Sequence, residues 1–89
     1  MSAAPRPVAE IFAQRLSLVA EVTALNARQL RLRQILGGIE VELMLGGDAP
    51  EDGLRQRDGD ARAAMAECDR LKAALEARIA ALDRELAAS

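Results

Sequence analysis

The sequence offers few side chains that could perform covalent chemistry. Its 89 residues contain no histidine, tyrosine or tryptophan and one cysteine, Cys68. A serine or cysteine nucleophile is normally activated by a neighbouring histidine, and zinc, haem and iron–sulfur sites need histidine or several cysteines. We therefore expect a protein that is not an enzyme, with no catalytic residues, no metal site, no cofactor and no small-molecule substrate.

Acidic residues near the middle of the chain come closest to a metal-binding pattern. Asp48 and Asp52 resemble the start of a calcium-binding loop. Pro50 occupies the third position of that pattern, however, and Gly59 stands where the closing glutamate is required. Asp48 followed by Pro50 and Glu51 is typical of the start of a helix, so we interpret the segment as a helix cap.

Basic residues in the N-terminal half could bind an anion. The candidate phosphate contacts are three arginines, Arg28, Arg31 and Arg33. Residues 1–39 carry five arginines and two glutamates, whereas residues 40–69 carry nine acidic residues and three arginines. Repeated in a ring or bundle, the basic cluster could bind nucleic-acid phosphates. In a single chain such arginines are more often a solvated helix flank, here with Glu67 or Asp69 as potential ion-pair partners.

The elements that must position these side chains are indicated by a heptad repeat. One series is Val8, Arg15, Val22, Gln29, Leu36 and Leu43, and the other is Ile11, Leu18, Leu25, Leu32 and Ile39. The repeat predicts a coiled-coil-like helix over about residues 7–45. We interpret Arg15 and Gln29 as lying at the edge of the apolar seam. The alternative is that they set its register or the number of helices.

A glycine-rich break separates this helix from a second one. The glycines in and after the break are Gly46, Gly47, Gly53 and Gly59. The turn spans about residues 46–53, or extends to residue 60, because glycine weakens a helix. Large apolar residues then recur every three or four positions among alanines, which predicts a second helix over about residues 54–87.

Two helices joined by a short turn predict an all-α fold, an antiparallel two-helix hairpin of coiled-coil type. We expect it to span residues 7–88, after a disordered start at residues 1–6. Facing residue numbers should sum to about 94, which places Phe12 near Leu82 and Val19 near Leu75.

Two observations suggest that the hairpin has further neighbours. Phe12, Leu16 and Val19 widen the apolar stripe at the N-terminal end. A two-helix chain is also too thin to hold a sizeable core. We therefore expect hairpins to assemble into a larger helical oligomer.

The first helix is most apolar just before the turn. The residues expected to form a protein interface there are Leu32, Ile35, Leu36, Ile39, Val41, Leu43, Met44 and Leu45. The opposing segment, residues 49–59, has Leu54 as its one large apolar residue, and a soluble protein rarely exposes such a patch. Two alternatives concern this region. Residues 39–45 could form a strand in an assembly, and Gly37 and Gly38 could admit a neighbouring backbone rather than being tolerated in a helix.

These features predict a non-enzymatic interaction protein that forms homo-oligomers or joins a larger protein assembly, as an adaptor, small chaperone or structural subunit. The alternative is a nucleic-acid-associated oligomer, similar in architecture to the helical cores of phage-type small terminase subunits in DNA packaging. We expect a cytoplasmic protein without membrane contact, because we find no signal-peptide pattern, no long charge-free apolar stretch and no cysteine pair. The excess of arginine over lysine is typical of GC-rich bacteria or their phages.

Overall fold

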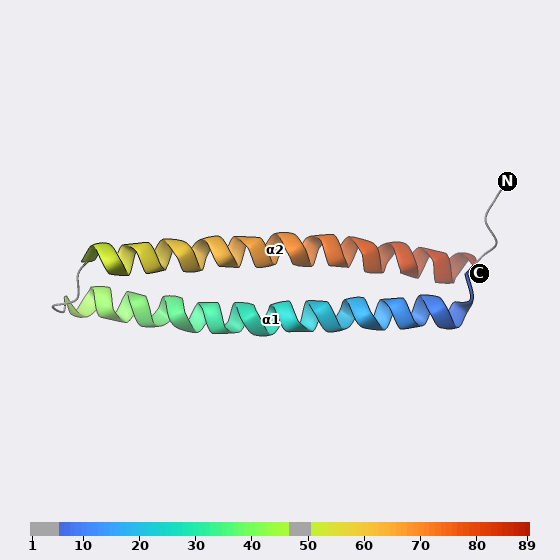
Figure 1. The fold of residues 1–89 in the computed structure, drawn as a ribbon, viewed down its shortest axis with the longest axis horizontal. Coiled ribbons are helices and arrows are strands. Elements are labelled where there is room, and N and C mark those ends of the chain that lie inside the picture. The colour runs from blue at the N-terminus through green and yellow to red at the C-terminus, as the bar shows by residue number, and fades with distance from the viewer. Residues whose placement is uncertain (1–5, 47–50) are drawn as a thin grey trace.

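Two long antiparallel helices form the molecule (Figure 1). The computed structural model describes residues 6–46 and 51–89, with side chains from residue 53 onward in the second segment. Helix α1 runs from Val8 to Leu45 and helix α2 from Glu51 to Ala88, 38 residues each. They lie side by side as a rod 67 Å long. The all-α hairpin expected from the sequence is confirmed, and the part of the chain that is described contains no strand.

The structure decides between the alternatives that the sequence left open near the turn. Helix α1 continues to Leu45, so residues 39–45 are helical and do not form a strand. Helix α2 begins at Glu51, so the turn does not extend to residue 60. The expected cap at Asp48 and Pro50, and the disordered start as far as residue 5, lie outside the described residues.

Backbone chemistry explains where α1 begins and ends. The carbonyl of Pro7 accepts hydrogen bonds from the backbone N–H groups of Glu10 and Ile11, at 3.0 and 3.2 Å. Proline suits this position because its missing N–H would have no helical partner there. At the other end Gly46 adopts φ +60°, and its N–H donates to the carbonyl of Leu43 at 3.4 Å. Glycine allows this left-handed conformation without a steric penalty.

One apolar seam joins the two helices. Its core consists of Ile11, Leu18, Leu75 and Leu82, with Val22, Leu25, Ile79 and Leu86 packed against it. The numbers of Ile11 and Leu82 sum to 93, close to the predicted 94. The expected neighbour of Leu82, Phe12, lies outside this core and is 55% exposed. Successive residues are about 100° apart around a helix, so placing Ile11 in the seam turns Phe12 away from it.

Candidate interaction surfaces

One polar side chain, Gln29, is buried where the sequence predicted a seam edge. Gln29 is 2% exposed. The side-chain Nε2 of Gln29 donates to Oδ1 of Asp69 at 2.6 Å. Nζ of Lys72 donates to Oε1 of Gln29 at 3.0 Å. The prediction that Gln29 lies at the edge is therefore wrong. Both ends of the amide find partners on α2, so the burial leaves no polar atom of Gln29 unsatisfied.

Arg15, the other polar seam position, does lie at the edge. Its Nε donates to Oδ1 of Asp83 on α2 at 2.7 Å, and both side chains remain well exposed to solvent. The hydrogen bond and the charge of Asp83 raise the pKa of the Arg15 guanidinium above its ordinary value. Exposed pairs of this kind contribute little to stability, so Arg15–Asp83 orients the two helices rather than holding them together.

The residues expected to form an interface before the turn do not share one face of α1. Ile39 is 1% exposed and belongs to the hairpin seam, and Leu32 and Leu36 are half-buried. The exposed members are Ile35, Val41, Leu43, Met44 and Leu45. At about 100° per residue, Val41 and Leu45 lie on the side of α1 opposite Ile39. We call the outward-facing residues Val41, Met44 and Leu45 the turn-end patch.

A second uncharged surface runs along the N-terminal half of α1. We define the α1 stripe as Ala9, Phe12, Ala13, Leu16, Val19, Ala20, Thr23, Asn26, Ala27 and Leu30. All except the half-buried Val19 are exposed, and Leu16 is 71% exposed. A shallow hollow of about 290 Å³ lies between Phe12, Arg15, Leu16 and Val19. The sequence signal for this surface was the widened apolar stripe, but the interface residues predicted from the sequence did not include it.

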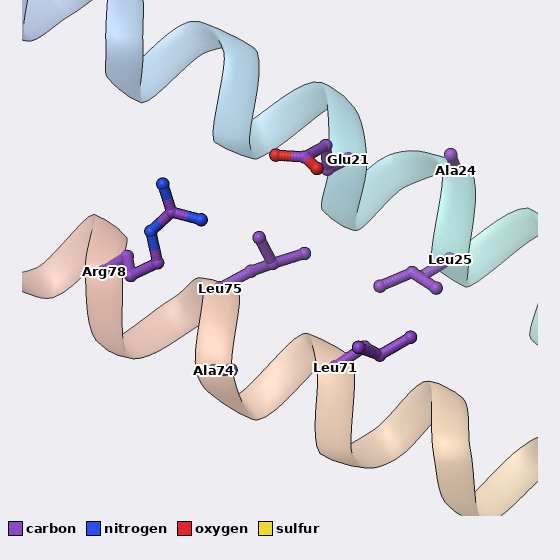
Figure 2. A pocket seen from close by; sticks show the side chains of 7 residues that line it. All are labelled: Glu21, Ala24, Leu25, Leu71, Ala74, Leu75 and Arg78. Atoms are coloured by element: carbon purple, nitrogen blue, oxygen red, sulfur yellow. The ribbon is translucent and has the colours of Figure 1, made fainter.

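A groove between the helices lies beside the seam in the middle of the hairpin (Figure 2). It has a volume of about 480 Å³ and is lined by Glu21, Ala24, Leu25, Leu71, Ala74, Leu75 and Arg78. Leu25, Leu71 and Leu75 point into the space between α1 and α2 in this view. The lining has no nucleophile and no set of metal ligands, so the groove offers apolar contact rather than chemistry.

The three candidate phosphate-binding arginines are solvent-exposed but point in different directions. Arg28 and Arg31 lie about 60° apart around α1, whereas Arg33 lies about 140° or more from either of them. All three are exposed, and no described residue pairs with them. Their expected partners are engaged elsewhere, because Glu67 pairs with Arg70, and Asp69 accepts a hydrogen bond from Gln29.

Within residues 6–46 and 51–89, no group of three or more metal-ligating side chains is close enough to hold an ion. Neither described helix has an apolar stretch long enough to cross a membrane. Comparison with protein families, curated proteins and solved structures finds no match to this chain.

Proposed function

We propose that this chain is a non-enzymatic structural or adaptor protein whose hairpins assemble with further copies of themselves through α1. One observation carries the proposal. Among the described residues, nine of the ten exposed large apolar side chains belong to α1 and one, Leu71, to α2. The hairpin therefore leaves one of its two helices apolar on the outside as well as in the seam.

The energetics support assembly rather than an isolated hairpin. Burying a Leu-sized side chain contributes about 1.5–3 kcal/mol, so a few exposed residues of α1 could stabilise an interface substantially. A two-helix chain has little interior of its own, and small scaffolds commonly gain stability by oligomerisation. An exposed apolar surface of this kind on a soluble protein marks a contact site.

The test is the molar mass of the full chain by light scattering after size exclusion, over a range of protein concentrations. We expect a defined multiple of 9.5 kDa that persists on dilution. Repeating the measurement at high salt separates apolar from ionic association, because salt screens exposed charges but not apolar contacts. A mass of one chain at every concentration would refute self-assembly.

The arginines support no second candidate function. Because Arg33 lies on a different side of α1 from Arg28 and Arg31, one helix cannot present all three to a single phosphate backbone. The acidic residues Glu40 and Glu42 follow directly on the same helix and would repel nucleic acid.

A further inference from the structure

We propose that the α1 stripe is the self-contact, and that it packs antiparallel against the same stripe of a second copy about a two-fold axis near Glu21. The inference rests on the proposed function, since it names the surface and partner for self-assembly. From Ala9 to Leu30 the stripe contains no charged residue, although α1 carries Glu10, Arg15, Glu21 and Arg28 over the same length. Those four charges lie on its other faces.

The stripe is complementary to itself in the antiparallel direction. Its members follow a spacing of three and four residues, as a helix–helix seam requires. With a two-fold axis near Glu21, the numbers of two residues that face each other across the contact sum to 42. The stripe then forms three kinds of facing pair, and the symmetry makes each pair occur twice. They are Phe12 with Leu30, Leu16 with Asn26, and Val19 with Thr23. Large side chains thus face a smaller or polar uncharged one, except at the ends, where Phe12 and Leu30 close the apolar contact.

Charge favours this direction over a parallel one. In the antiparallel register Glu10 of each copy lies at a level between Arg31 and Arg33 of the other, at both ends of the contact. A parallel pairing in register would place Glu10 against Glu10 and Arg33 against Arg33. Opposite charges at matching levels steer association and suppress the wrong orientation, whereas like charges penalise it.

The hairpin geometry also accommodates the second copy. The stripe and the seam to α2 are about 140° apart around α1, so a second copy packs on the side of α1 that faces away from α2, and α2 does not obstruct it. The overlap of residues 8–34 is about 40 Å long and one helix wide.

The first experiment compares single charges at exposed sites of α1, using light scattering and circular dichroism on the full chain. Leu16→Glu should raise the dimer dissociation constant about a hundredfold or more, because the charge would be buried against a second helix. Leu16 lies outside the core joining α1 to α2, so helicity should persist. Ser17→Glu adds the same charge beside the stripe and should leave the mass unchanged, as should Met44→Glu at the turn end. Leu30→Glu provides a second test within the stripe.

The second experiment determines whether the α1 helices of the two copies pair antiparallel or parallel. It uses a short bis-maleimide cross-linker and a Cys68→Ala background that retains the wild-type oligomeric mass. Chains carrying Ala13→Cys and Ala27→Cys should cross-link when mixed, because these positions lie about 3 Å apart along the axis. Ala13→Cys chains alone should not cross-link, since their two cysteines would be about 24 Å apart.

The outcomes separate this inference from the proposed function. A wild-type monomer overturns both. A wild-type oligomer that dissociates with Met44→Glu but not with Leu16→Glu or Leu30→Glu preserves self-assembly and overturns the stripe. Efficient cross-linking of Ala13→Cys chains alone overturns the antiparallel arrangement.

Discussion

Truncation of Ile39 and of Met44 tests which apolar side chains before the turn are buried between the helices and which are exposed. Both belong to the segment that the sequence predicted as a single interface, yet Ile39 is 1% exposed and Met44 is 85% exposed. Truncating each to alanine should therefore have very different effects on the free energy of unfolding.

The expected magnitudes follow from burial. Ile39→Ala removes three buried carbons at about 0.8 kcal/mol each and leaves a cavity, which together cost about 3–4 kcal/mol. A domain of this size loses about 4–8 °C in Tm for each kcal/mol, so Tm should fall by about 12–32 °C. Met44→Ala removes a side chain that makes few contacts, and should change the free energy of unfolding by less than about 0.5 kcal/mol.

The assay is urea unfolding followed by far-ultraviolet circular dichroism. Measuring each variant at two protein concentrations separates hairpin stability from association, since only association makes the transition depend on concentration. A cost below about 1 kcal/mol for Ile39→Ala would refute its place in the hairpin seam. Equal costs for the two variants would show that the segment acts as one surface after all.

Two further predictions concern the buried amide and the glycines, and both can be read from thermal unfolding. Gln29→Ala should cost about 2–3 kcal/mol, and Gln29→Leu about 1 kcal/mol or less, because leucine restores the volume while Asp69 is exposed enough to rehydrate. Equal costs would mean that the hydrogen bonds, not the volume, matter. Gly59→Ala should stabilise the hairpin by about 1 kcal/mol, because it lies within α2 and an added Cβ meets no atom within 4 Å. Gly46→Ala should instead destabilise by about 1–2 kcal/mol, because its φ of +60° is strained for alanine. A destabilising Gly59→Ala or a stabilising Gly46→Ala would contradict the assigned backbone.

The local pattern was enough to predict the helices and their antiparallel pairing. Heptad spacing depends on the fixed turn of the helix, so residues seven apart share a face whatever lies opposite. The end of α1 followed from Gly46, and the axial register followed from the short turn. The sequence left the length of the turn open because Gly53 and Gly59 weaken a helix. Helix α2 nevertheless begins at Glu51, since the cost of two glycines is small beside that of leaving the seam unpaired.

Which face of α1 meets α2 was decided by tertiary structure. Each apolar residue of α1 could pack against α2 or point outward, and a one-residue step around the helix separates Ile11 in the core from Phe12 outside it. Gln29 is buried because Asp69 and Lys72 happen to lie across the seam, a pairing 40 and 43 residues distant along the chain. The sequence by itself determined that this protein is a helical hairpin, since helical periodicity is local. Only the packed pair of helices decided which apolar residues remain outside, because burial depends on residues far away in the chain.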